Sequence, residues 1–148
     1  MATVFDVAAY ILQNKGPMTA WKLQKLVYYS QAWSLVWDER PLFNERIEAW
    51  ANGPVCPDLY KVHRRQFIVS EIPCGDPAEL DRIGAETVDA VLDFYGNMHP
   101  QQLSDLTHSE APWADARSGI LPGMAGCREI THDAMAAYYE GLSASTAD

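Results

Sequence analysis

A chain of 148 residues with 48% hydrophobic and 11% aromatic residues can bury its own core, and we expect a single domain over residues 1–148. Its net charge of −9 makes nucleic acid an unlikely ligand, because phosphates repel an acidic surface, and it favours a basic protein partner. No apolar stretch approaches the ~20 residues that span a bilayer, and no signal peptide is evident, so we expect no membrane association. The cysteines Cys56, Cys74 and Cys127 are odd in number and widely spaced, which is typical of reduced thiols in a cytoplasmic protein.

The first two predicted helices follow each other closely. Thr3 and Asp6 form a capping box for a helix that Gly16-Pro17 ends. Thr19 then caps a second helix over residues 20–38. Residues 28–37 of this helix are apolar nearly all round, so we expect it to lie in the centre of the fold.

The first half of the second helix is amphipathic. Its apolar spacing places one set of side chains inward and Lys22 and Lys25 outward, in solvent. The inward set is Leu23, Leu26, Val27 and Ser30.

A short β element is expected after this helix. Residues 47–50 alternate apolar and polar side chains, which predicts a strand paired with Leu42-Phe43. Asn52-Gly53-Pro54 is a turn signal, and Pro57 opens a helix to about Phe67. Residues 68–75 are expected to form an irregular connection or a short strand.

A long helix is predicted over residues 77–95. Asp76 and Glu79 fit a capping box, with Pro77 at the first helical position and Gly96 at the end. The expected buried stripe is Leu80, Ile83, Thr87, Val91 and Phe94.

The C-terminal third is predicted to contain short helices at 100–107 and 112–117, a loop at 118–128, and a helix from the cap Thr131 to Leu142. Residues 143–148 are expected to fray. The fold class is therefore mainly α: one compact helical domain with a long buried central helix and a small β-hairpin or short strands near residues 42–50.

No catalytic, metal-binding or cofactor-binding residues are identifiable. His108 and Glu110 match half of a zinc-deaminase signature, but the Cys-x-x-Cys half is missing. We interpret them with Trp113 as a structural knot, in which the histidine caps a helix end and the indole packs below it. The cluster Lys61, His63, Arg64 and Arg65 is interpreted as a solvated helix end.

Several motifs, in order, resemble the Panacea domain of the SocA-like antitoxin family, which includes GepA-type phage-associated proteins. The opening signature is KLQKLVYYSQ at 22–31, followed by PLF at 41–43, IEAW at 47–50, GPV at 53–55 and LY at 59–60. LS at 103–104, LTH at 106–108, PW at 112–113 and AR at 116–117 complete the set, whereas Asn52 departs from the aromatic residue that usually precedes the glycine. The motif residues to which we assign structural roles are Leu23, Lys25, Leu26, Tyr28, Tyr29, Trp50, Gly53, Pro54, Pro57, Tyr60, His108 and Trp113.

The resemblance implies a helical protein that acts by binding protein, as an antitoxin that neutralises a cognate, basic toxin. One family member resembles an adaptor that delivers its toxin to the ClpXP protease, so a ClpXP-type protease is a further implied partner. A homo-oligomer is left open. The alternative is a DNA-binding regulator, or an enzyme whose active site is assembled from distant residues.

The candidate partner-binding surface is acidic. Glu79, Glu86, Asp89 and Asp93 are predicted to share one face of the helix at 77–95, with Arg82 as the only base among them. Such a face either keeps an amphipathic helix soluble or steers a basic toxin.

Overall fold

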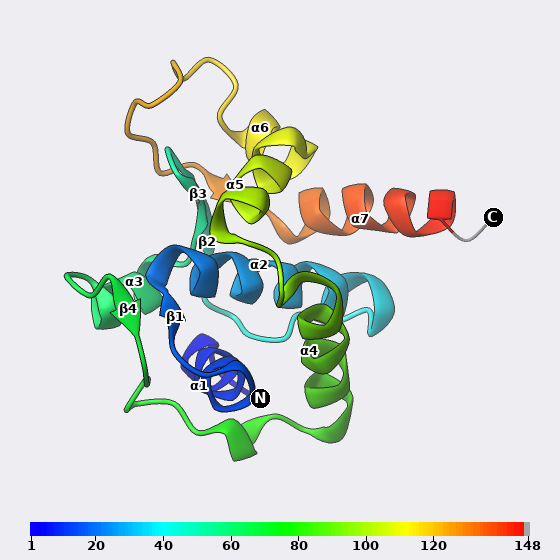
Figure 1. The fold of residues 1–148 in the computed structure, drawn as a ribbon. Helices are drawn as coiled ribbons and strands as arrows, with labels where there is room; N and C mark the ends of the chain where they lie inside the picture. Colours follow the sequence, from blue (N-terminus) through cyan, green and yellow to red (C-terminus); the bar gives the residue numbers. More distant parts are fainter. Residues whose placement is uncertain (147–148) are drawn as a thin grey trace.

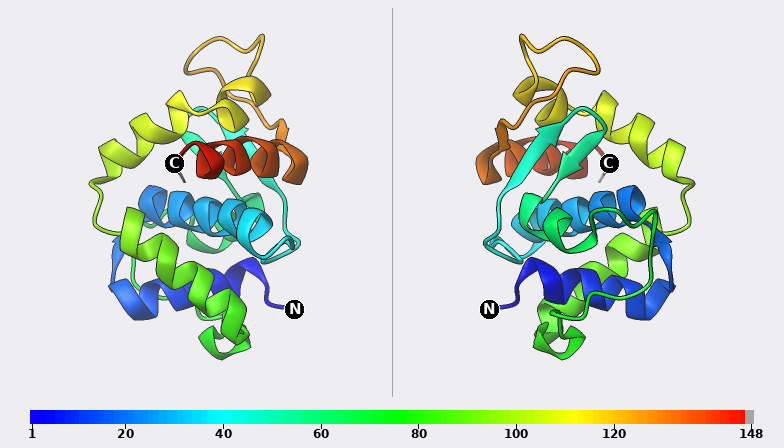
Figure 2. Two further views of the ribbon diagram at one scale, coloured as in Figure 1. Left: turned by 90° about the vertical axis from the view of Figure 1, so that its right-hand side faces the viewer. Right: turned by 90° about the vertical axis from the view of Figure 1, so that its left-hand side faces the viewer.

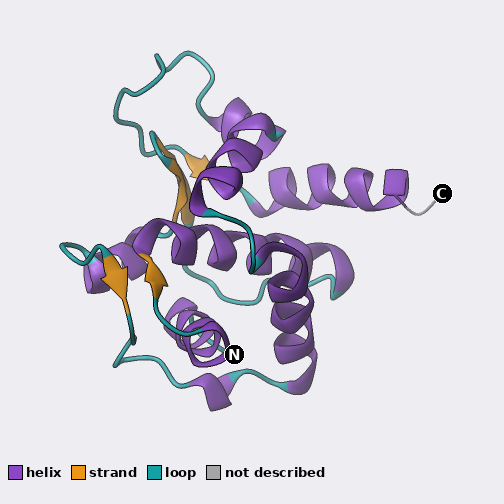
Figure 3. Ribbon diagram, viewed as in Figure 1, coloured by secondary structure: helices purple, strands orange, loops and turns teal. Residues whose placement is uncertain are grey.

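The computed structural model describes residues 1–146 and is mainly helical (Figures 1 and 3). The helices are α1 Val4–Lys15, α2 Ala20–Trp37, α3 Pro57–His63, the 3-10 turn η1 Pro77–Glu79, α4 Arg82–Tyr95, α5 Pro100–Ser109, α6 Ala111–Ala116 and α7 His132–Thr146. The strands are β1 Met18–Thr19, β2 Ile47–Trp50, β3 Gly53–Val55, β4 Ile68–Val69 and β5 Glu129–Ile130.

The central helix is α2, as its apolar sequence predicted. It packs against α1, α4, α5 and α7, which approach it from different sides (Figures 1 and 2). Residues 23–34 are all buried, and the Tyr28 and Tyr29 rings are among the largest fully buried side chains. The Thr19 hydroxyl accepts a hydrogen bond from the Lys22 amide and caps the helix start, as expected.

The N-terminal helix α1 also begins and ends as predicted. Thr3 and Asp6 form the capping box, and Gly16 ends the helix with a φ of 80°. Asp6 is buried and has a second role, because its other carboxylate oxygen accepts the amide of Asp76 at 2.8 Å. The capping residue thereby ties α1 to the connection before α4.

The predicted pairing of β2 with Leu42-Phe43 is wrong. β2 pairs antiparallel with β3 on one side and with β5 on the other, so the hairpin spans residues 47–55. Leu42 and Phe43 instead donate their amides to Gln31 Oε1, at 2.7 and 3.3 Å, and the Phe43 carbonyl accepts from Gln31 Nε2. A side chain of α2 therefore satisfies the backbone groups that the predicted strand partner was expected to satisfy.

Helix α3 starts at Pro57 as expected but stops at His63, not Phe67. The backbone leaves the helix at Arg64, and Arg65 has a φ of 75°. His63 is buried with its Nε2 2.8 Å from Gln24 Nε2, so it takes no part in an exposed basic cluster. The following segment contains β4, which pairs with β1.

The predicted helix at 77–95 is interrupted. Asp76 caps only the short turn η1, and Asp81 caps α4 through the Gly84 amide. The helix is therefore rotated relative to the predicted stripe: Ile83 and Phe94 are exposed, at 52% and 67%, whereas Val88, Leu92 and Tyr95 are buried with Thr87 and Val91. Two capping aspartates compete in this stretch, and only the second is followed by uninterrupted helix.

Lys25 was predicted to lie in solvent but is buried. The β2–β3 hairpin covers this face of α2, and a Cβ atom on Gly53 would lie 3.2 Å from Lys25 Cε. Helical periodicity predicts which side chains of an isolated helix are polar, but it cannot show that the hairpin covers the side of α2 that contains Lys25.

The C-terminal third agrees with the prediction apart from its helix ends and the strand β5, which was not predicted. α5 runs to Ser109, and residues 118–128 form a loop before β5. Thr131 accepts the Ala134 amide at 3.1 Å at the start of α7, which continues past Leu142 to Thr146. Residues 143–148 were expected to fray, but residues 143–146 continue α7, and residues 147–148 lie outside the described residues.

We expect Gly53→Val to lower the free energy of unfolding by about 1–3 kcal/mol. Gly53 has a φ of 133°, which valine disfavours, and the added side chain would press on Lys25. Thermal and urea unfolding measure the effect. Gly141→Ala is the control, because its Cβ meets no atom within 4 Å, and it should be neutral or slightly stabilising. Equal stability of Gly53→Val and the unmodified protein would contradict this role.

Candidate protein-binding surface

Side chains of α2, α4, α5 and α7 line an apolar groove. The arrangement of these four helices can be followed in the left view of Figure 2. It has a volume of about 510 Å³. Trp37 and Phe94 form part of its wall and are 48% and 67% exposed, although both are large apolar side chains. Leu142 of α7 also lines the groove. Contiguous exposed aromatic surface of this kind is typical of a protein-binding site.

Beneath the groove lies a buried network of tyrosines around one carboxylate. Glu110, which also lines the groove, accepts hydrogen bonds from the hydroxyls of Tyr29 at 2.7 Å and Tyr139 at 2.8 Å, both at Oε1. The Tyr28 hydroxyl lies 3.0 Å from that of Tyr139. The Tyr29 ring also stacks on Tyr95, with the ring centroids 4.0 Å apart. The network links α2, α4 and α7 to the start of α6, and so fixes the floor of the groove.

Burial sets the protonation of this network. It raises the pKa of the Glu110 carboxyl, and the two tyrosine hydrogen bonds only partly offset this effect. Burial is likewise the main cause that raises the pKa of Tyr95 to about 12. Near neutral pH the tyrosine hydroxyls are therefore protonated: those of Tyr29 and Tyr139 donate to Glu110, whereas that of Tyr95 accepts from the Trp33 indole N–H.

The acidic residues predicted to share one face are split by the break before α4. Glu79 belongs to η1, and only Glu86, Asp89 and Asp93 lie on α4, all three exposed. Glu86 pairs with Arg82 at 3.1 Å, and Asp89 accepts the Tyr10 hydroxyl at 2.7 Å. Within residues 1–146, Asp93 has no such partner and directly precedes Phe94 at the groove.

The other helices around the groove are acidic as well. α5 and α7 contain no lysine or arginine, and they carry three acidic residues, all exposed. These are Asp105, Asp133 and Glu140. The one basic residue on α4 is the paired Arg82, so α4, α5 and α7 present a negative surface, whereas the lysines of α2 are Lys22 and Lys25 in its first two turns.

His108 and Trp113 form a structural contact, as interpreted from the sequence, but the histidine does not cap a helix end. Its ring stacks on the Trp113 indole at 4.0 Å, with an interplanar angle of 6°, and it hydrogen-bonds the backbone of Asn52. The indole N–H of Trp113 donates to the Trp50 carbonyl at 2.8 Å. Together these contacts hold α5 and α6 against the β2–β3 hairpin.

The three cysteines differ in their burial. Burial raises the pKa of the Cys56 thiol to about 12, which keeps it protonated and unreactive. Cys74 and Cys127 are exposed. Over residues 1–146, no three His, Cys, Asp or Glu side chains are close enough to share a metal ion. In the same part of the chain, every helix is too short or too polar to cross a membrane.

The family motif residues lie around α2 and the hairpin. Leu23, Leu26, Tyr28 and Tyr29 are buried within α2, and Lys25 faces the hairpin. The others lie in the hairpin, in α3, or in α5 and α6. They are Trp50, Gly53, Pro54, Pro57, Tyr60, His108 and Trp113.

The profile of the antitoxin SocA-like, Panacea domain family matches residues 23–114. Antitoxin SocA of Caulobacter vibrioides (strain NA1000 / CB15N) is 32% identical to this chain over 110 residues. The match covers 66% of this chain and 58% of that relative, so this chain spans less than two thirds of the length of the relative. No solved structure matches the chain. The chain belongs to the SocA-like, Panacea domain family.

The groove and its floor were missed from the sequence. Glu110 was interpreted only as a neighbour of His108, and Tyr139 was not singled out. The available signal was the exposed aromatic Phe94 beside acidic residues, but the predicted rotation of the helix placed Phe94 inward. The tyrosine partners of Glu110 are 81 and 29 residues away in the chain, so no local pattern connects them.

We expect Glu110→Ala to lower the free energy of unfolding by about 2–4 kcal/mol, because two buried hydroxyls lose their acceptor. Glu110→Gln keeps one oxygen at that place and should lose much less. Denaturant unfolding of both variants measures the difference, and equal losses would contradict the role of the shared acceptor.

Glu110→Gln should also differ from the wild-type protein in its dependence on pH. The folded protein raises the pKa of Glu110 and so binds its proton more tightly than the unfolded chain. The stabilisation from this proton is complete below the unfolded pKa and is lost as pH rises through the folded pKa. The stability of Glu110→Gln relative to wild type should therefore increase from acidic to neutral pH. A constant difference would show that Glu110 does not titrate in this way.

Proposed function

We propose that this protein is an antitoxin that neutralises a cognate toxin by direct protein binding. Membership of the SocA-like, Panacea domain family supports an antitoxin role. The observation that supports direct protein binding is the groove. Trp37 and Phe94 line it and are exposed, and α4, α5 and α7 around it are acidic. Large aromatic side chains in a concave surface commonly dominate the energy of protein interfaces.

The toxin segment that fits this groove is amphipathic and basic. Its apolar side chains would contact Trp37, Phe94 and Leu142, and its lysines or arginines would face Asp93 and the acidic residues of α5 and α7. Rim charges act mainly on the association rate, whereas the apolar contacts slow dissociation. The net charge of −9 favours the same kind of partner over long distances.

We propose a binding protein in preference to an enzyme or a DNA-binding regulator. The second helix of a helix-turn-helix must present its surface to a groove of DNA, whereas α2 is covered on its sides by α1, α4, α5 and α7. A sequence-specific DNA complex at moderate salt, or turnover of a substrate, would favour the alternative class.

Neutralisation can proceed by blocking the toxin or by delivering it to a ClpXP-type protease as an adaptor. The lifetime of the toxin separates the two modes. An adaptor shortens it only in cells that contain the protease, whereas a blocking antitoxin leaves the toxin stable and bound.

Co-expression with the product of the neighbouring reading frame tests the proposal. The neighbouring product alone should arrest growth, and this protein should restore growth and co-purify with it as a complex. Arrest without restoration would contradict the assignment for that pair.

The groove should supply the binding energy. Phe94→Ala and Trp37→Ala are expected to weaken toxin binding by about tenfold or more each, because exposed aromatic anchors are typical hot spots. Phe67→Ala is the matched control, since Phe67 is 75% exposed but lies between α3 and β4, away from the groove. Calorimetric titration measures the affinities. Equal affinity of all three variants would remove the groove from the interface.

The acidic rim should set the association rate. Asp93→Lys combined with Glu140→Lys is expected to slow association at low salt by about tenfold, and this difference should shrink as salt is added. Asp58→Lys combined with Glu71→Lys changes the net charge equally at exposed positions outside the groove. Stopped-flow mixing measures both rates. If the two double variants behave alike, only the overall charge matters, not its position at the groove.

A further inference from the structure

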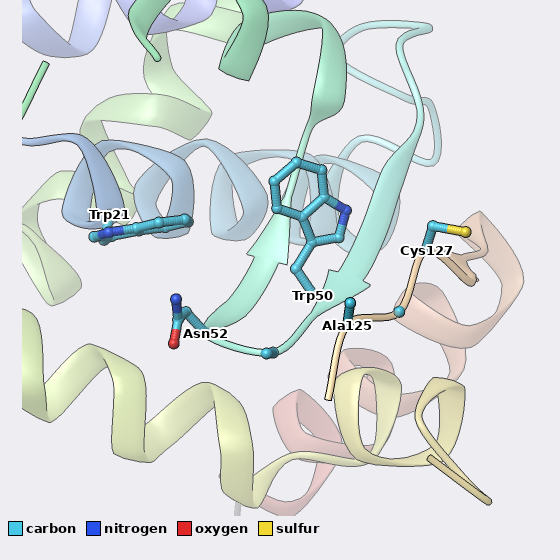
Figure 4. A pocket seen from close by; sticks show the side chains of 7 residues that line it. Trp21, Trp50, Asn52, Ala125 and Cys127 are labelled. Carbon is cyan, nitrogen blue, oxygen red and sulfur yellow. The ribbon is translucent and has the colours of Figure 1, made fainter. Parts of the chain in front are cut away.

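A second concave site lies at the β2–β3 hairpin, on a different part of the molecule from the groove. It has a volume of about 490 Å³, and Figure 4 shows Trp21 and Asn52 on one side of Trp50, with Ala125 and Cys127 on the other. Trp21 belongs to α2, Trp50 and Asn52 belong to the hairpin, and the remaining wall comes from the loop before β5. The pocket is mainly apolar.

A buried ammonium group lies behind this pocket. Lys25 is 3% exposed, and its Nζ is 6.0 Å from the centroid of the Trp21 ring. It is also 3.5 Å from the position that a Cβ atom on Gly53 would occupy, next to Asn52 of the pocket wall. Among residues 1–146, no side chain or carbonyl hydrogen-bonds or ion-pairs with this ammonium. Burial lowers its pKa to about 8, so the charged form is held at a cost.

Two further basic side chains approach the same place. Arg117 is buried behind Gly126 of the pocket wall, where a Cβ atom would lie 3.2 Å from Arg117 Nη1. Its guanidinium donates to the carbonyls of Ala49 and Met124 and to no carboxylate. His108 Nε2 is buried without a hydrogen-bond partner in the described chain, and the charges of Lys25 and Arg117 both lower the His108 pKa.

The local charge is opposite to that of the whole protein. Glu48, the acidic residue beside Trp50, already binds Arg46 at 3.0 Å and the Trp50 indole N–H at 2.9 Å. Asp105 lies close enough to raise the pKa of His108, but it is exposed and accepts from Gln101. Although the chain has 20 acidic residues, none of them within residues 1–146 ion-pairs with Lys25, whose ammonium lies over the Trp21 ring of the apolar pocket. Structural lysines in protein interiors are normally paired, so this one is better explained by a ligand.

We propose that this pocket binds a carboxylate carried on an aromatic or similar apolar group, with Lys25 as its charged contact. The apolar body would lie between Trp21 and Trp50, and the carboxylate would reach the ammonium beside Asn52. A carboxylate is favoured over a phosphate because the net charge of −9 repels a dianion more strongly than a monoanion, and Arg117 already donates to backbone carbonyls. The site lies outside the groove, so it does not depend on the proposed toxin interface.

Two sources can supply this chemistry: a free aromatic acid or the C-terminal carboxylate of a protein chain. The probes are therefore phenylacetate, N-acetylphenylalanine and its uncharged amide, titrated into the full chain. Calorimetry gives affinities, and the NMR shifts of the Trp21 and Trp50 indole N–H groups locate the binding. We expect the two acids to bind saturably and the amide to bind about tenfold or more weakly, as expected for loss of a charged hydrogen bond. Tighter binding of phenylacetate identifies a free acid, and tighter binding of N-acetylphenylalanine identifies a chain terminus.

Lys25→Met should abolish the preference for acid over amide without loss of thermal stability, because methionine fills a similar volume and carries no charge to desolvate. Lys22→Met is the matched control: it removes a charge from the same helix, on a half-buried side chain outside the pocket, and should keep the preference. Trp21→Ala should weaken both probes, which tests the site even if Lys25→Met fails to fold. Equal binding of acid and amide, an undiminished preference in Lys25→Met, or full affinity in Trp21→Ala would each overturn the proposal.

Discussion

The fold depends on the burial of α2 on all sides, because every polar group on this helix must then find a partner inside the protein. Gln24 and Gln31, seven residues apart on one face, do this in the same way. Gln24 binds the backbone amide of Cys56 and contacts its carbonyl, and Gln31 binds both backbone groups of Phe43. Each glutamine side chain makes the hydrogen bonds that a neighbouring strand would otherwise make. The backbone amides and carbonyls of the buried segments beside α2 are therefore satisfied. Ser30 and Ser34 are satisfied by nearby carbonyls, and Lys25 is the exception.

Much of the helical framework could be predicted, since its signals are local. The Thr3–Asp6 capping box and Thr19 act within three residues, and the apolar run of α2 can only be buried. Sequence reasoning failed where residues far away in the chain determine the local structure. Leu42 and Phe43 form no strand because Gln31 takes the place of their partner, and Lys25 is covered by a hairpin that follows 22 to 30 residues later. At α4, the helix was predicted to start from the Asp76 cap, whereas it starts from Asp81. Of the predicted buried stripe, Ile83 and Phe94 are therefore exposed, although Thr87 and Val91 are buried.

The candidate binding surface was less predictable than the fold. Acidic residues on α4 were identified, but their role in binding remains a prediction, and Glu79 proved to lie outside the helix. The groove combines side chains from α2, α4, α5 and α7, and its floor needs the contact of Glu110 with Tyr29 and Tyr139. Each of these residues looks like ordinary core or surface in its own segment. Family motifs marked the α2 and hairpin framework instead, where residues hold the structure together.

Because α7 is the last helix of residues 1–146, the groove can form only after the other helices have been synthesised. The groove wall at Leu142 and the hydrogen bond from Tyr139 are made by a helix that leaves the ribosome after all its packing partners. Protein synthesis proceeds at about 5–20 residues per second, so several seconds pass between the synthesis of α2 and that of α7, which encloses Tyr28 and Tyr29. Until then an apolar helical surface is exposed that chaperones and proteases recognise. A chain that lacks α7 therefore leaves one side of α2 uncovered and one wall of the groove missing, so the groove and the core are completed by the same late step.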